Sequence, residues 1–218
     1  MYDYAVIVII IVFVIALLVR ILGGPYAFAS KGAYGEYLVR EAILKLSPDN
    51  KILQNLYIPT RNGSTEIDVV WVSRKGIFVF ESKNYSGWIF GSEDSEQWMQ
   101  IIYDERRQFY NPVKQNKTHI YALQKLIKEK TDYYNIIVFS NRCEFKELNI
   151  KSNNVFVINY NNIHELISAI WNNSEDMLSE DDIDRIYNFL SKYKAENVDP
   201  SVIEEHNRYV QSKAQLSE

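Results

Sequence analysis

Two apolar runs in the first half of the chain are separated by a polar turn, in the pattern of a β-hairpin. The runs cover residues 66–73 and 76–83 and flank the sequence Ser73-Arg74-Lys75-Gly76. Continuous apolar runs further along are typical of strands that are buried on both faces of a sheet. The other strands that the pattern predicts lie at about 51–58, 135–139 and 155–158, with a short strand and connecting segments in 87–103.

Helical periodicity fills the segments between these strands. Asn111 is a good N-cap and Pro112 suits the first helical position, so one helix should begin there. The predicted helices cover about 32–46, 112–130, 161–172 and 179–194, and a polar tail from 195 to 218 is a loosely held helix at most. Strands that alternate with helices predict an α/β sandwich around a central mixed sheet.

The N-terminus carries a separate signal. The chain is unbroken apolar from Tyr4 to Val19, and two apolar residues continue past Arg20. Residues 4–22 therefore predict one transmembrane helix, followed by a linker at 23–30. No Lys or Arg precedes the span, whereas Arg20, Lys31 and Arg40 follow it. The positive-inside rule then places the N-terminus outside and the soluble domain in the cytoplasm.

Three charged residues at the strand ends form the candidate site. Opposed residues of a simple hairpin have a constant index sum, which places Asp68 opposite Glu81, and Lys83 points to the same face as Glu81. Opposed like charges destabilise a sheet, and a divalent cation such as Mg²⁺ or Mn²⁺ would remove that cost. The alternative is a solvated strand end at which Lys83 pairs with Glu81 or with Glu66.

Several short motifs stand in a fixed order around these residues. Together they resemble the nuclease-related domain family, a branch of the PD-(D/E)xK restriction-endonuclease-like superfamily, from about Lys31 to Ile127. The initial Pro-Asp of the superfamily is not kept, because Asp68 follows Ile67. The motifs are Gly32-Ala-Tyr-Gly-Glu36, Leu56-Tyr-Ile-Pro59, Gly63-Ser-Thr-Glu-Ile-Asp68, Gly76-Ile-Phe-Val-Phe-Glu-Ser-Lys-Asn84, Gly87-Trp-Ile-Phe-Gly91 with Trp98, and Asn111-Pro-Val-Lys-Gln-Asn116.

The resemblance implies a three-layer α/β fold and a metal-dependent phosphodiesterase centre. By matching position, the catalytic residues would be Glu36, Asp68, Glu81, Lys83 and Gln115. Asp68 and Glu81 would hold the metal, and the position of the Ser82 carbonyl permits it to be a further ligand. Glu36 could instead complement the dipole of its helix, and Gln115 could brace a loop. Trp88 and Trp98 could stack on bases, although core packing is favoured.

Charge is distributed unevenly along a chain whose net charge is −4. Residues 101–130 hold seven basic residues against three acidic ones, whereas residues 174–205 hold ten acidic residues against three basic ones. A phosphate backbone would be drawn to the first segment, unless that segment is an ordinary solvated helix face. The residues that we predict to bind nucleic acid are Arg106, Arg107, Lys114 and Lys117.

Other chemistries have little support in the sequence. The lone Cys143 cannot form an internal disulfide, and the three histidines show no metal-ligand spacing. His119 is interpreted as a packing or rim residue. We therefore expect a nuclease core at 31–130 that continues through 131–194, with nucleic acid as the partner and DNA favoured over RNA. The alternatives are a catalytically silent nucleic-acid-binding scaffold, and a membrane-tethered regulator that acts through its acidic C-terminal helices.

Overall fold

A computed structural model describes residues 11–14, 31–46, 51–61 and 63–215. The elements are, in chain order, α2 (Lys31–Leu46), β1 (Lys51–Thr60), β2 (Gly63–Ser73), β3 (Gly76–Lys83), β4 (Gly87–Ser92), β5 (Gln97–Ile102), β6 (Glu105–Tyr110), α3 (Pro112–Leu126), β7 (Tyr133–Phe139), β8 (Cys143–Asn149), β9 (Val155–Asn159), η2 (Tyr160–Asn162), α4 (Ile163–Asn173), α5 (Glu180–Leu190), η3 (Ser191–Tyr193) and α6 (Pro200–Gln215).

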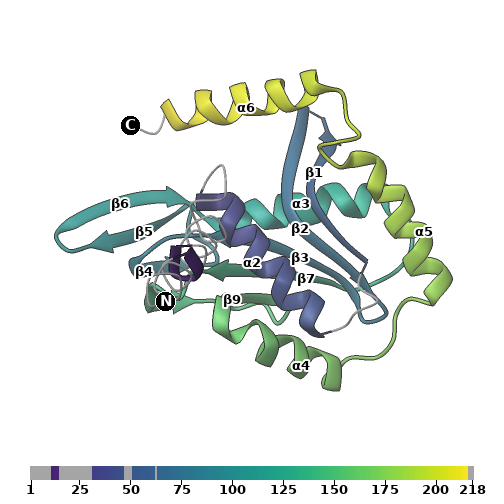
Figure 1. Cartoon of the computed structure of the whole chain (residues 1–218), viewed down its shortest axis with the longest axis horizontal. Helices are drawn as coiled ribbons and strands as arrows, with labels where there is room; N and C mark the ends of the chain where they lie inside the picture. Colours follow the sequence, from purple (N-terminus) through teal and green to yellow (C-terminus); the bar gives the residue numbers. More distant parts are fainter. Residues whose placement is uncertain (1–10, 15–30, 47–50, 62, 216–218) are drawn as a thin grey trace, which may run out of the picture.

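A five-stranded sheet in the order β1-β2-β3-β7-β9 forms the middle layer. β1, β2 and β3 pair antiparallel, whereas β3, β7 and β9 run parallel, so the sheet is mixed. Apolar side chains of α3 and α5 pack on one face, and those of α2 and α4 pack on the other. Figure 1 shows α2 in front of this sheet and α3 behind it. The predicted α/β class with a mixed sheet is therefore confirmed, with helices on both faces.

The β2–β3 hairpin has the predicted register. Ser73 pairs with Gly76 and Val69 with Phe80, so the index sum of opposed residues is constant along the hairpin. Gly76 has a φ of +127°, and a Cβ there would lie 2.5 Å from the Asp132 carbonyl oxygen. Only glycine meets both conditions, which explains why the turn closes at this residue.

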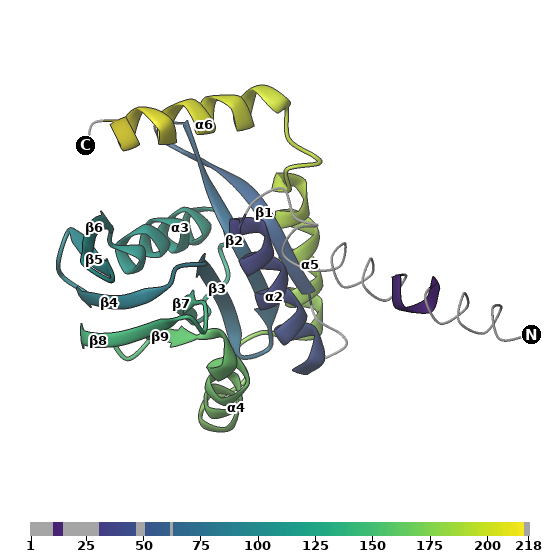
Figure 2. The same cartoon turned by 60° about the vertical axis from the view of Figure 1, so that its left-hand side comes forward.

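A second sheet, in the order β6-β5-β4-β8, was not predicted. It projects from the main sheet beyond the end of β3, as Figures 1 and 2 show. Its inner face buries Ile89 and Trp98 against Phe139 and Val113, so Trp98 is a core residue. Trp88 is 48% exposed and carries the Lys146 ammonium over its ring. The sequence pattern did not predict this sheet, because its strands are short, β6 and β8 are mainly polar, and β8 joins it from a distant part of the chain.

Other boundaries differ from the prediction in smaller ways. α3 ends at Leu126, because its C-cap Ile127 is already extended. The predicted helices at 161–172 and 179–194 each include a 3₁₀ turn, η2 and η3. The polar tail forms α6, which lies across the tip of the β1–β2 hairpin in both views (Figures 1 and 2).

The predicted transmembrane helix at 4–22 falls outside the described residues, apart from 11–14. Within the described part of the chain, no helix is long and apolar enough to cross a membrane.

Candidate functional site

Asp68 lies at the point where β2 and β3 separate. The last ladder pair is Val69 with Phe80, and beyond it the Asp68 carboxylate accepts a hydrogen bond from the Ser82 backbone N–H at 2.8 Å. The Asp68 side chain therefore bonds to β3 at a position where the backbones of β2 and β3 no longer pair. Asp68 and Glu81 are neighbours, as the index sum predicted.

Glu81 and Lys83 form a buried pair on the adjoining strand. Lys83 Nζ lies 2.6 Å from Glu81 Oε1 and 3.1 Å from Gln115 Oε1, and it donates to both. The side chains of Glu81 and Lys83 are only 2% and 17% exposed. The alternative of a solvated strand end is therefore wrong, because the ion pair exists but is enclosed. Gln115 reaches the pair from α3, as predicted, and orients the ammonium rather than bracing a loop.

His119 is a further member of this cluster, and its interpretation as a packing or rim residue was incomplete. Its Nε2 lies 3.2 Å from Glu81 Oε2, and its Nδ1 lies 2.8 Å from Thr65 Oγ1. A carboxylate can only accept, so Nε2 donates to Glu81 and Nδ1 accepts from the Thr65 hydroxyl. His119 lies one helical turn after Gln115, which is the only signal in the sequence that places it on the same face.

Burial and charge act in opposite directions on the two strand carboxylates. Burial and the charge of Glu81 raise the pKa of Asp68 well above its usual range. Burial would also raise the pKa of Glu81, but Lys83 and the hydrogen bond from His119 outweigh it and lower that pKa to about 2. Glu81 is therefore fully charged near neutral pH, whereas at Asp68 burial and the charge of Glu81 outweigh the opposite effect of the Lys83 charge.

Glu36 approaches the cluster from α2. A Cβ at Gly35 would lie 2.5 Å from Ser82 Oγ, so the glycine permits the helix to lie close against β3. α2 begins at Lys31, which places Glu36 in the second turn, beyond the free N–H groups that would favour a negative charge. Burial, together with the charges of Glu66 and Glu81, raises the pKa of Glu36 to about 7. The helix-dipole alternative is not supported.

Glu66 lies near Glu36, and His206 lies near Glu66; neither was predicted as a site residue. His206 on α6 donates from Nδ1 to the Ser64 carbonyl at 3.1 Å, and its Nε2 lies 3.8 Å from Glu66 Oε2. The Tyr57 hydroxyl also bonds to Glu66, and the Tyr57 ring meets that of His206 edge-on. Glu66 lies two residues before Asp68 on β2, so both side chains point to the same face of the sheet and the alternation could have identified Glu66. No local signal in the sequence identifies His206.

The donor set fits a divalent cation by its chemistry. Carboxylate oxygens suit Mg²⁺ and Mn²⁺, and burial together with neighbouring carboxylates raises the pKa values of Asp68 and Glu36. In the described ranges, no three His, Cys, Asp or Glu side chains are already arranged around one metal position. Both Glu81 oxygens already accept a hydrogen bond, from Lys83 and from His119, and each keeps a second lone pair that could bind a cation. The Ser82 carbonyl stays a predicted ligand.

The four predicted nucleic-acid-binding residues fall in two separate places. Arg106 and Arg107 lie on β6, where Arg107 pairs with Glu105 at 3.1 Å. Lys114 and Lys117 lie on α3 and line a cavity of about 340 Å³ that also contains Glu93 and Asp94. Lys114 pairs with Glu96 at 2.6 Å. Phosphate binding by these residues stays a prediction, and for Arg107 and Lys114 it would compete with an existing ion pair.

The raised pKa of Glu36 predicts how the metal-free chain responds to pH. The folded state holds a proton on Glu36 up to about pH 7, whereas an unfolded glutamate loses it near 4.5, so stability should fall between these values. The slope is at most about 1.4 kcal/mol per pH unit, and less because Glu36 is partly exposed. Glu36→Gln should flatten this decline in urea unfolding without metal. Glu41→Gln, on the same helix, should not, and an equal slope in all three proteins would contradict the assignment.

Comparison with known proteins agrees with this geometry. The family model of the nuclease-related domain matches residues 31–140, which hold Glu36, Asp68, Glu81, Lys83 and Gln115. An uncharacterized protein of Bacillus anthracis is 32% identical over 185 residues, which cover 84% of this chain and 85% of that protein. No solved structure matches the chain. The chain therefore belongs to the nuclease-related domain family.

Proposed function

We propose that the chain is a metal-dependent nuclease that hydrolyses phosphodiester bonds of nucleic acid. The observation that carries this proposal is the enclosed contact of Lys83 with both Glu81 and Gln115, beside a second buried carboxylate, that of Asp68, whose pKa is raised. A purely structural ion pair between Lys83 and Glu81 would not need a second buried carboxylate beside the same ammonium. Such perturbed carboxylates are characteristic of functional sites.

Each residue has a task that follows from its chemistry. A divalent cation, when bound, would polarise the phosphate and make a water molecule more acidic. Asp68 and Glu81 would hold that cation. The Lys83 ammonium would stabilise the negative charge that develops on the phosphoryl oxygens, and Gln115 would keep it oriented. Glu36, with a pKa of about 7, can accept the proton of the attacking water near neutral pH.

The proposal is tested by incubating the full-length chain, purified in detergent, with single- and double-stranded DNA and RNA in the presence of Mn²⁺. Cleavage that EDTA abolishes and that depends on Lys83 supports the nuclease. Binding of nucleic acid and metal without cleavage of any substrate would contradict the nuclease proposal and indicate a catalytically silent binding module.

We further propose that residues 4–22 anchor the chain in the membrane with the soluble domain in the cytoplasm. The support is the apolar run and the Lys/Arg asymmetry. A cysteine in place of the exposed Ser212 should resist an impermeant thiol reagent in intact cells, whereas one in place of Tyr2 should react. The native Cys143 gives little background, because burial raises its pKa to about 11. Equal labelling of Ser212→Cys in intact and lysed cells would contradict this orientation.

A further inference from the structure

The acidic character of the site creates a problem for a polyanionic substrate. Glu36 lies near Glu66, Asp68 and Glu81, and the ammonium that acts on Asp68 and Glu81 is that of Lys83. A bound cation and Lys83 can neutralise the scissile phosphate, but the neighbouring phosphates of the same strand would still face carboxylates. A substrate strand therefore needs a positive group next to the cluster and outside it.

Arg142 occupies such a position. β3 and β7 are parallel, and Lys83 pairs with Phe139, so their carboxyl ends lie at the same edge of the sheet (Figure 1). Just beyond this edge, Arg142 Nη2 donates to Asn84 Oδ1 at 2.7 Å and to the Asn84 carbonyl at 3.3 Å. Asn84 directly follows Lys83, so the guanidinium lies at the same end of β3, toward the α2 side on which Gly35 faces Ser82 and Asn84, whereas Lys83 faces Gln115 of α3.

The turn that carries Arg142 is fixed at several points. The Ser140 hydroxyl accepts from the Arg142 backbone N–H at 3.2 Å and from its Nε at 3.4 Å. The Arg142 carbonyl accepts from the Gly87 N–H at 3.0 Å, and Cys143 N donates to the Ser140 carbonyl at 3.0 Å. The guanidinium is therefore oriented before any ligand arrives, which lowers the entropy cost of binding.

The charge of Arg142 is also uncompensated. All acceptors of its side chain are neutral, and no carboxylate among the described residues lies within ion-pair distance. Its Nη1 makes no hydrogen bond to the described part of the chain. Arg107 and Lys114, by contrast, are paired with Glu105 and Glu96. An exposed arginine that is held by neutral groups keeps both its charge and its free donors for an anion.

We propose that Arg142 binds a phosphate of the substrate strand next to the scissile phosphate. This inference rests on the proposed nuclease function and assigns a contact that lies outside residues 31–140. A phosphodiester oxygen is the ligand, so the contact is independent of base sequence. It would hold the strand across the carboxyl ends of β3 and β7, the edge at which ligands bind in open α/β sheets.

The test measures binding of short fluorescein-labelled single-stranded and duplex DNA and RNA to the full-length chain in detergent, with Mn²⁺. The Lys83→Ala background removes cleavage while binding is measured. Arg142→Ala should weaken binding about tenfold, as expected for one charge-assisted hydrogen bond, and lower the salt slope by about one unit. Arg142→Lys should keep the salt slope but recover only part of the affinity, because it loses the planar fork.

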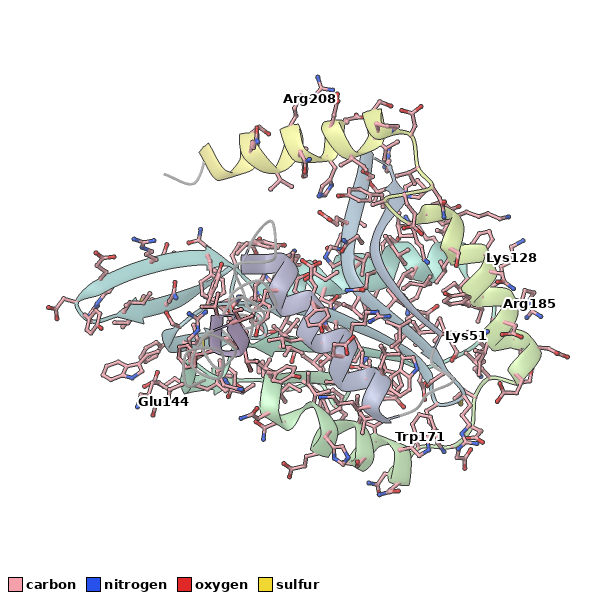
Figure 3. All side chains as sticks on the ribbon, in the orientation of Figure 1. Lys51, Lys128, Glu144, Trp171, Arg185 and Arg208 are labelled. Atoms are coloured by element: carbon pink, nitrogen blue, oxygen red, sulfur yellow. The ribbon has the colours of Figure 1, made fainter. Side chains whose placement is uncertain are left out.

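Arg208→Ala is the matched control, because Arg208 projects from the outer side of α6 (Figure 3) and should change neither quantity. With Lys83 intact, Arg142→Ala should raise KM and leave kcat within about twofold. An unchanged thermal midpoint would show that the turn still folds. If Lys83→Ala binds DNA and Arg142→Ala leaves its affinity and salt slope unchanged, only the assignment of Arg142 fails. If no protein of the series retains DNA or RNA, both this inference and the proposed function are overturned.

Discussion

Mn²⁺ should raise the thermal midpoint of the wild-type chain and of Lys83→Ala, but not that of Asp68→Asn. A ligand that binds only the folded state stabilises it by mass action, by about 2.7 kcal/mol at one hundred times its Kd. Asp68→Asn keeps the oxygen that accepts from Ser82 N–H, so the strand ends stay in place while the negative charge is lost. The metal-free variant should be at least as stable as the wild type, because burial and the charge of Glu81 disfavour the charged Asp68.

Lys83→Ala should separate metal binding from catalysis. Removal of the ammonium leaves Glu81 buried with only His119 as its partner, so the metal-free variant should lose about 3–5 kcal/mol of stability, the usual cost of breaking a buried pair. Mn²⁺ should recover part of that loss, because it supplies positive charge to the same carboxylates. Cleavage should nevertheless fall by at least about a hundredfold, since Lys83 acts on the charge of the transition state.

The two measurements are thermal unfolding across a Mn²⁺ titration and cleavage of labelled DNA and RNA. Lys45→Ala, at an exposed position near the end of α2, is the matched control and should behave as the wild type in both. Undiminished cleavage by both Asp68→Asn and Lys83→Ala would show that the activity resides elsewhere. Mn²⁺ stabilisation of Asp68→Asn equal to that of the wild type would remove Asp68 from the metal site.

Substitution of His119 should be the second most damaging change. His119→Ala leaves the Thr65 hydroxyl and one Glu81 oxygen without their partner in a buried setting, at a cost of about 1–3 kcal/mol. It should also weaken Mn²⁺ binding about tenfold or more, because groups that orient a metal ligand are nearly as important as the ligand itself. The loss of affinity is the informative result, since a residue that served packing alone would lower only stability.

Two further variants identify the part of the His119 contact that matters. His119→Gln places an amide N–H close to the position of Nε2, so it should restore much of the Mn²⁺ affinity. Thr65→Val removes the hydroxyl that contacts Nδ1 and orients the ring, so it should resemble a mild His119→Ala. His164→Ala, at an exposed position of α4, is the control. Unfolding in urea and Mn²⁺ titrations measure both effects, and unchanged Mn²⁺ affinity in His119→Ala would return His119 to a packing role.

The sequence by itself determined the parts of the site that depend on local periodicity. Strand parity and a constant index sum placed Asp68, Glu81 and Lys83 together, because a short hairpin leaves one register once its turn closes at Gly76. The same reasoning gave the helix that begins after Asn111, whose side chain accepts from Val113 N and Lys114 N. The family motifs added Glu36 and Gln115, which local patterning could not connect to the hairpin.

Only the tertiary structure decided which distant residues complete the site. His119 meets Glu81 across 38 positions, Arg142 meets Asn84 across 58, and His206 meets Ser64 across 142. Each contact depends on how a helix or turn packs on the sheet. Apolar periodicity predicts which face of an element is buried, but it does not predict the element against which that face packs. The second sheet was missed for the same reason, because β4 pairs in parallel with β8, which lies beyond α3 and β7 in the sequence. Local sequence patterns thus determined the positions of Asp68, Glu81 and Lys83, and tertiary packing determined which residues surround them.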